Sequence, residues 1–400
     1  MKFSKNLFNN FLFLFLFLFS VMISATSVAN PIADLFQLLG SIKVSDVVFM
    51  LVLSILLFSN DFYTRAQYTI RAEPFVTLLI FLFLIFIIIS IFGNIEFASE
   101  RMLAHLFRYI YYIGIIFTFA YISTYYIPIQ KIFFSLYMGG FVMCSSVLYL
   151  MFFQDMGLMY GNGIRKLDSV LGANPVATYA AIIFPIGLYL AREASGIILR
   201  GFYVTSTSLI VLAALLAESK AAWLAITCSF FIFFVFQDFK RKMYIAALVF
   251  MIFLIFFEDI YSIVMLEINT SGSNSMQRLD MFMAAMDYLL ENFLTGIGPS
   301  NFIVISPYGT EPHSAYALIF AELGLFGGLT YMFLIITMII RLLKYRQDKA
   351  SQLLIMLMVN IGVLSLFTGL VSTQIIFYIL IGLYLGHITL LKITYCERYY

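Results

Sequence analysis

Charged residues are scarce in this chain of 400 residues: they make up 11% of it, whereas hydrophobic residues make up 63%. A soluble domain is typically about half apolar and about one quarter charged, so these side chains cannot cover a surface that faces water. Lysine and arginine (23) nearly balance aspartate and glutamate (21), and no basic face for nucleic acid is indicated. The composition argues against soluble enzymes, nucleic-acid binders and disordered scaffolds, and it is typical of a polytopic membrane protein.

Cysteine clusters and nucleotide motifs are also lacking. Cys144, Cys228 and Cys396 stand singly in the sequence, which predicts neither a disulfide framework nor a zinc site. The sequence has no Asp-x-Asp pair and no Walker-type glycine loop, which disfavours a metal-bound nucleotide-sugar donor and ATP. We therefore expect no metal and no cofactor.

Long apolar runs are what the sequence does have. A helix that crosses about 30 Å of hydrocarbon needs about 20 mostly apolar residues, and the period-two alternation of a membrane β-barrel is absent. We predict an all-α fold, a polytopic membrane helix bundle of about 12 transmembrane helices. The predicted spans are 7–28, 44–60, 74–93, 109–128, 132–152, 175–191, 201–217, 221–237, 243–257, 313–340, 351–371 and 374–391.

The distribution of lysine and arginine predicts the orientation of these spans. With a cytoplasmic N-terminus and alternating sides, 16 of the 23 basic residues fall on the inside and 7 on the outside, as the positive-inside rule requires. Both termini are then cytoplasmic. The first span follows Lys2 and Lys5 and precedes Ser27-Val28-Ala29, so it is read either as a retained helix, which we favour, or as a cleaved signal peptide.

The longest segment between spans, 258–312, is predicted to be one large periplasmic loop. Within it, 276–290 reads as an amphipathic helix, capped by Asn274 or Ser275, that lies at the membrane surface or on the bundle. One face carries Gln277, Asp280, Ala284, Asp287 and Glu291, and the other carries Leu279, Phe282, Met283, Met286, Leu289 and Leu290. Arg278 falls at the edge of the apolar face, either as a snorkelling arginine or as a ligand of a phosphate group.

Two further motifs follow this helix. The Gly296-Ile297-Gly298-Pro299 sequence predicts a turn, and Gly298 would also let backbone N–H groups approach a phosphate or sugar. His313 begins the span 313–340 at the outer interface, where a histidine can act as a general base. Glu322 lies well inside that span, which is costly unless it is paired or functional. On an ideal helix it lies about 180° from His313, so the two are not expected to act together.

Several basic residues on the predicted outside depart from the preference of positive charge for the inside. They are Lys220, Arg278, Arg165 and Lys166. Lys220 is read either as the ion-pair partner of Glu218 or as a ligand of an anionic headgroup. Because arginine and lysine bind phosphate strongly, these side chains could converge on a lipid-linked diphosphate.

Four segments resemble, in the same order, the motifs of the O-antigen ligase and O-antigen polymerase superfamily. They are LGANPVATYAAIIFP, LLAESKAAWLAI, the block from Arg278 through LTGIGPSNF, and PHSAYALIFAELGLFGGLTYMFLI. The resemblance covers about 160–340. It implies domains at 1–153 (N-terminal helices), 154–345 (the ligase-like core) and 346–400 (C-terminal helices).

The resemblance also implies an activity. The family consists of inner-membrane glycosyltransferases that use glycans carried on undecaprenyl diphosphate, with lipid A–core or a glycan as acceptor. It implies a catalytic role for His313 and substrate-binding roles for Arg278, Lys220, Arg165 and Gly298. Lys220 stands where many members have arginine, and the alignment at Arg165 is loose. We expect an O-antigen ligase; the alternatives are an O-antigen or exopolysaccharide polymerase, a peptidoglycan glycosyltransferase and, from another class, a flippase or other secondary transporter.

Overall fold

The computed structural model describes residues 60–94, 100–153, 173–217, 219–237, 272–368 and 375–399, with short stretches inside 10–16 and 37–43. The regular structure in these residues is helical, apart from an antiparallel pair of short strands, β1 (Gln37–Leu39) and β2 (Ile42–Lys43). Eight of the helices in this part of the chain are long and apolar enough to cross a membrane. The prediction of an all-α, multi-pass membrane bundle is confirmed at this level.

The described helices include ones at the predicted spans, but also helices at 60–72 and 302–305 that the sequence analysis did not predict. In chain order, the described helices are α4 (Asn60–Ala72), α5 (Pro74–Gly93), α6 (Glu100–Tyr125), α7 (Ile129–Phe153), α8 (Ala173–Glu193), α9 (Ile197–Leu216), α10 (Lys220–Val235), α13 (Gly272–Glu291), α14 (Phe302–Ile305), α15 (Ala315–Leu343), α16 (Lys349–Phe367) and α17 (Ile375–Tyr399). The predicted spans 7–28, 44–60 and 243–257 lie wholly or largely outside the described residues. The count of about 12 spans and the periplasmic position of 258–312 therefore stay predictions.

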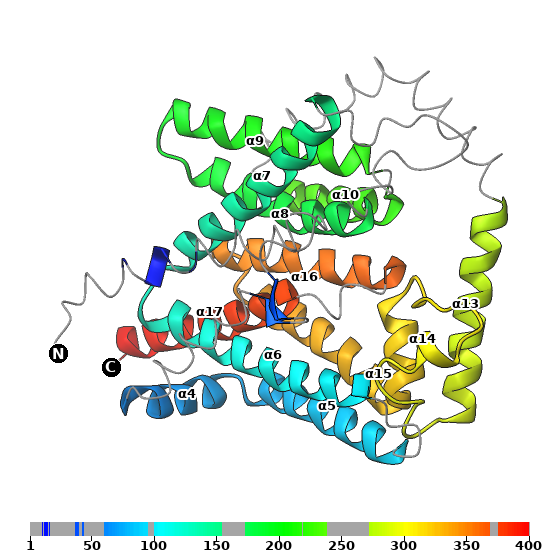
Figure 1. Cartoon of the computed structure of the whole chain (residues 1–400). Helices are drawn as coiled ribbons and strands as arrows, with labels where there is room; N and C mark the ends of the chain where they lie inside the picture. Colours follow the sequence, from blue (N-terminus) through cyan, green and yellow to red (C-terminus); the bar gives the residue numbers. More distant parts are fainter. Residues whose placement is uncertain are drawn as a thin grey trace.

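Helix α16 is the centre of the bundle. It packs against α8 and α10 on one side and against α15 and α17 on the other, and Figure 1 shows it between these two groups. Asn360 of α16 is fully buried; its side-chain amide donates to the Ala181 carbonyl oxygen at 2.7 Å, and its side-chain oxygen bonds the Ser229 hydroxyl. Polar contacts between helices add to van der Waals packing inside a membrane, and this one joins α8, α10 and α16.

The helices alternate in direction, so the bundle has two distinct ends. We call the end at which α5 finishes and α10, α15 and α17 begin the His313 end. The opposite end, where α15 finishes and α16 begins, is the Lys392 end. In Figure 1 the His313 end lies on the right, and the last turns of α17 lie toward the left.

The Lys392 end holds an ionic cluster around a buried carboxylate. The Glu73 side chain is 3% exposed and accepts a hydrogen bond from Lys392 Nζ at 2.8 Å. Arg341 Nε lies 4.0 Å from Glu73, and the Tyr384 hydroxyl donates to it at 3.4 Å. The cluster therefore joins α5, α15 and α17 at the end that the sequence assigns to the cytoplasm.

Candidate functional site

Helix α13 lies across the His313 end, crosswise to the long helices (Figure 1), and packs on α15. Its packed side is narrow: Met281 and Ala285 are buried, and Tyr288 packs beside them on the small cluster that includes Phe302 and Ala321. The acidic face that the sequence predicted is exposed. The helix begins at Gly272, so the prediction that Asn274 or Ser275 caps it is wrong.

The apolar face predicted for this helix is largely exposed rather than packed. Leu279 and Met283 are each 53% exposed and Leu290 is 72% exposed. At 100° per residue these side chains lie away from Met281 and Ala285. Helix α13 thus has three sides, one packed on the bundle, one acidic and one apolar that faces away from the bundle.

Arg278 lies on the bundle side of α13. It stands one turn before Met281 and is half-buried, whereas its neighbours Gln277 and Leu279 are exposed. The sequence placed it at the edge of the apolar face, and the structure places it between that face and the packed side. Both roles considered for this residue, a snorkelling arginine and a phosphate ligand, are compatible with this position.

The turn after α13 is fastened to a break in α15. Gly324 has a left-handed backbone conformation (φ 72°) inside the helix, which leaves carbonyl groups of the preceding turn without helical partners. The amide of Ile297 donates to the Ala321 carbonyl oxygen at 2.9 Å and that of Gly298 to the Glu322 carbonyl oxygen at 3.0 Å. The amide of Leu325 donates back to the Phe293 carbonyl oxygen at 2.9 Å. We call residues 293–298 and 321–325 the junction.

The end of α5 also binds the junction. The Ser90 hydroxyl donates to the Glu322 carbonyl oxygen at 2.6 Å, and the Asn94 side-chain amide donates to the Gly296 carbonyl oxygen at 3.0 Å. Three segments far apart in the sequence are therefore held together, two through their backbones and α5 through its Ser90 and Asn94 side chains.

The Glu322 side chain fixes the next part of the turn. Its carboxylate accepts hydrogen bonds from the backbone N–H groups of Ser300 and Phe302. Ser300 has a positive φ of 62°, a conformation that is uncommon for residues other than glycine. Glu322 thus holds the turn through these two N–H groups; its separation from His313 stays a prediction.

His313 is exposed and stands just before α15 rather than in its first turn. Ser314 is the N-cap of α15: its hydroxyl accepts from the Ala317 amide at 3.3 Å and donates to the Ser365 carbonyl oxygen at 3.3 Å. Capping by serine stabilises a helix start, and the second bond ties this start to the end of α16. The backbone beside His313 is therefore anchored, while its ring faces the surface of the His313 end.

Arg108 and Glu311 add charge to the same end. Burial raises the pKa of the Glu311 carboxyl, and the nearby Arg108 guanidinium partly offsets this increase. Arg108 was not predicted as a site residue. Its position at the start of the apolar part of α6 is the sequence feature that could have identified it.

The other predicted site residues are placed as follows. Lys220 is the first residue of α10 and is exposed at the His313 end, but α16 stands between α10 and α15. Gly298 is buried, and its N–H is engaged by Glu322. Arg165 and Lys166 lie outside the described residues. Over the residues that the structure describes, no three His, Cys, Asp or Glu side chains gather closely enough to hold a metal ion.

The fold and the site define a multi-pass helical membrane protein with a polar, cation-bearing surface at one end of the bundle. Residues 205–332 match the family model described as O-antigen ligase. This stretch includes Lys220, Arg278, His313 and the whole junction, and the match confirms the predicted relation to the O-antigen ligase and polymerase superfamily. No curated protein matches the chain.

Proposed function

We propose that this protein is a membrane glycosyltransferase that moves a glycan from undecaprenyl diphosphate to a sugar hydroxyl of lipid A–core on the periplasmic side, as an O-antigen ligase. The observation that carries this proposal is the junction. It fastens α13, which bears Arg278, to α15, which begins two residues after His313, and both residues lie in the region that matches the O-antigen ligase family.

In this proposal the reaction needs few protein groups. The acceptor oxygen forms a bond to C1 of the donor sugar, the bond from C1 to the diphosphate oxygen breaks, and the polyprenyl diphosphate leaves with the electron pair. Arg278 neutralises the charge on the leaving group, and His313 takes the proton of the acceptor hydroxyl. Arg108 and Lys220 add positive charge at the same end of the bundle, and Arg165 is the further predicted ligand. No metal is required for these steps.

Transfer by the purified protein in liposomes tests the proposal. The donor is a radiolabelled oligosaccharide on undecaprenyl diphosphate, and the acceptor is lipid A–core. We expect His313→Gln to lower the rate of transfer by about 10²- to 10⁴-fold, the usual contribution of a general base. Arg200→Ala, which removes a cation at the Lys392 end, is the control for Arg278→Ala. Transfer at the normal rate by both His313→Gln and Arg278→Ala would refute the assignment.

The same assay separates an enzyme from a transporter. A glycosyltransferase forms a covalent product, whereas a flippase moves the labelled donor across the bilayer unchanged.

The alternative within the family is a polymerase. In a deletion strain, absence of capped lipopolysaccharide indicates a ligase, and caps of a single repeat unit indicate an O-antigen polymerase. A normal ladder with loss of capsule indicates an exopolysaccharide polymerase.

A further inference from the structure

The break at Gly324 separates the start of α15 from the rest of the helix. A kink of this kind lets the two parts of a helix take different directions. His313 stands just before the first part, 315–323, and the long second part begins at 325. The junction fixes the end of the first part that lies nearest the break. The opposite end, beside His313, needs a support of its own.

A row of hydroxyl groups provides this support. The Ser314 hydroxyl donates to the Ser365 carbonyl oxygen at 3.3 Å, and the Ser365 hydroxyl is hydrogen-bonded to the Tyr331 hydroxyl at 2.9 Å. Ser365 lies near the end of α16, where a helix leaves carbonyl groups without a partner, and Tyr331 lies on the second part of α15. The end of α16 therefore bridges the two parts of α15.

This row of hydroxyl groups is shielded from water. Ser314 is 8% exposed, Ser365 is 0% exposed and Tyr331 is 1% exposed. A hydrogen bond in such surroundings is stronger than one that competes with water. The bridge is therefore a fixed part of the bundle rather than a surface contact.

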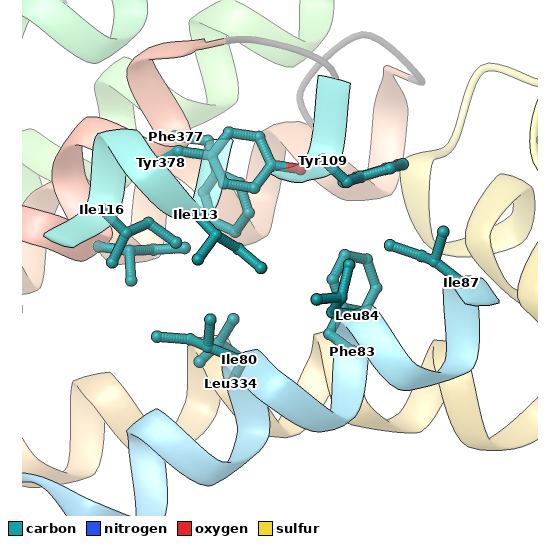
Figure 2. Close-up of a pocket in the computed structure, with 11 residues that line it drawn as sticks. Ile80, Phe83, Leu84, Ile87, Tyr109, Ile113, Ile116, Leu334, Phe377 and Tyr378 are labelled. Carbon is teal, nitrogen blue, oxygen red and sulfur yellow. The ribbon is translucent and has the colours of Figure 1, made fainter. Parts of the chain in front are cut away.

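Rings from three helices hold Tyr331 in place. Its ring centroid lies 5.5 Å from that of Tyr316, in the first turn of α15, 6.0 Å from that of Phe83 and 5.6 Å from that of Phe377. Figure 2 shows Phe83 on the α5 side and Phe377 on the α17 side of the apolar space between these helices. Such close packing leaves the Tyr331 hydroxyl little freedom to move away from Ser365.

We propose that Tyr331 and Ser365 are positioning residues for His313. This proposal rests on the proposed function, in which His313 takes the proton of the acceptor hydroxyl. Both residues are buried, so they act through Ser314, the residue next to His313, and not on the substrate. A general base has to lie within hydrogen-bond reach of the proton that it removes. A displacement of about 1 Å can lower a rate by about 100-fold.

Hydrogen exchange of the purified full-length protein tests the bridge without any transfer reaction. Tyr331→Phe keeps the ring contacts and removes the hydroxyl, and Ser365→Ala removes the other half of the same bond. We expect the amides of 315–323 to exchange about two- to tenfold faster in both variants, the range that corresponds to one hydrogen bond.

Tyr137→Phe is the matched control for this measurement. It also removes a buried tyrosine hydroxyl that is bonded to a serine, but the serine is Ser206, and the bond joins α7 to α9. The control should leave exchange in 315–323 unchanged. Unchanged exchange in Tyr331→Phe and Ser365→Ala, or an equal increase in the control, would overturn the proposal.

Kinetics in the liposome assay test the consequence for transfer. Tyr331→Phe and Ser365→Ala should each lower kcat by about tenfold and leave KM for the donor unchanged, because the position of the base changes and donor binding does not. The double variant should be no slower than either single variant, since all three lose the same bond. In a His313→Gln background, Tyr331→Phe should lower kcat no further, because there is no base left to position.

The two backgrounds separate positioning from a general structural effect. An equal fall in kcat with and without His313, or a rise in KM at constant kcat, would overturn the positioning role and leave the proposed function intact. Normal transfer by His313→Gln, or no transfer by the wild-type protein, would instead refute the reaction proposed for this site, and the positioning role would fall with it.

Discussion

Gly296 and Gly324 meet backbone to backbone: a Cβ atom on Gly296 would lie 2.6 Å from the amide nitrogen of Gly324. A Cβ atom on Gly324 would in turn lie 2.6 Å from the Leu294 carbonyl oxygen. Both glycines have positive φ values, 65° and 72°. No other residue fits either position without moving the turn away from α15.

The first prediction concerns these two glycines. Gly296→Ala or Gly324→Ala should lower the midpoint of thermal unfolding of the purified protein and reduce its yield, because each adds a backbone clash to a strained φ. Gly309→Ala is the control. Gly309 also has a positive φ of 61°, but a Cβ atom added there would meet nothing within 4 Å, so only the conformational cost, about 1 kcal/mol, remains. Equal effects at all three positions would show that the close approach is unimportant.

The second prediction concerns Glu322. Glu322→Ala should lower the thermal midpoint more than Glu322→Gln does, because alanine leaves the N–H groups of Ser300 and Phe302 without their acceptor. An unsatisfied buried donor costs about 1–3 kcal/mol, whereas glutamine keeps one acceptor oxygen. Thermal unfolding of both variants provides the measurement. If glutamine is as disruptive as alanine, the negative charge rather than the hydrogen bond is what matters.

The third prediction follows from Glu311, whose pKa is raised by burial and lowered in part by Arg108. An acid with a higher pKa in the folded state binds its proton more tightly there, so this group favours folding at low pH and opposes it as pH rises through the folded pKa. Glu311→Gln should therefore raise the thermal midpoint near neutral pH and have little effect at about pH 4. Glu291→Gln, at an exposed position on α13, is the control. A thermal midpoint near neutral pH that Glu311→Gln leaves unchanged would contradict this account.

The fourth prediction concerns Asp348, the N-cap of α16. Burial raises the pKa of its carboxyl, but hydrogen bonds from His387 and Ser351 outweigh burial, and the pKa lies below its usual value. A lowered pKa adds stability above the unfolded-state pKa, and this stability is lost as pH falls through the folded-state pKa. Asp348→Asn should therefore lower the thermal midpoint near neutral pH, and the difference from wild type should shrink below about pH 4.

Asparagine is itself a good N-cap, so the Asp348→Asn variant retains an acceptor for the Ser351 amide, which lies 2.7 Å from the aspartate oxygen. The comparison isolates the charge and its contact with His387 at 3.0 Å. A difference in thermal midpoint between the variant and wild type that stays constant across the pH range would contradict this explanation.

Hydropathy predicted most of the bundle because the membrane imposes one length and one polarity on every span. The predicted span 74–93 has the same bounds as α5, and α15 begins at Ala315, two residues after the predicted start at His313. These features depend on local sequence alone. The predicted start of α13 was too late because the prediction relied on apolar periodicity, and the first turn of this helix has none.

The candidate site was harder to predict because its parts depend on contacts between distant segments. The break at Gly324 is set by residues 293–298, and nothing near Gly324 distinguishes it from a packing glycine. The packed side of α13 relies on Ala285, which a hydrophobic-face argument gives little weight. Arg278 and His313 were identified by residue type and resemblance, and their functional roles stay predictions.

The junction is made mainly of main-chain atoms, and this decides which changes evolution or an engineer can make there. Side chains at 293 and 325 can vary, since it is the Phe293 carbonyl and the Leu325 amide that form the bond between them. Adding or deleting one residue between Asn292 and Gly298 would instead shift every donor past its acceptor. The junction therefore depends on the length of segment 293–298 more than on the identity of most of its side chains.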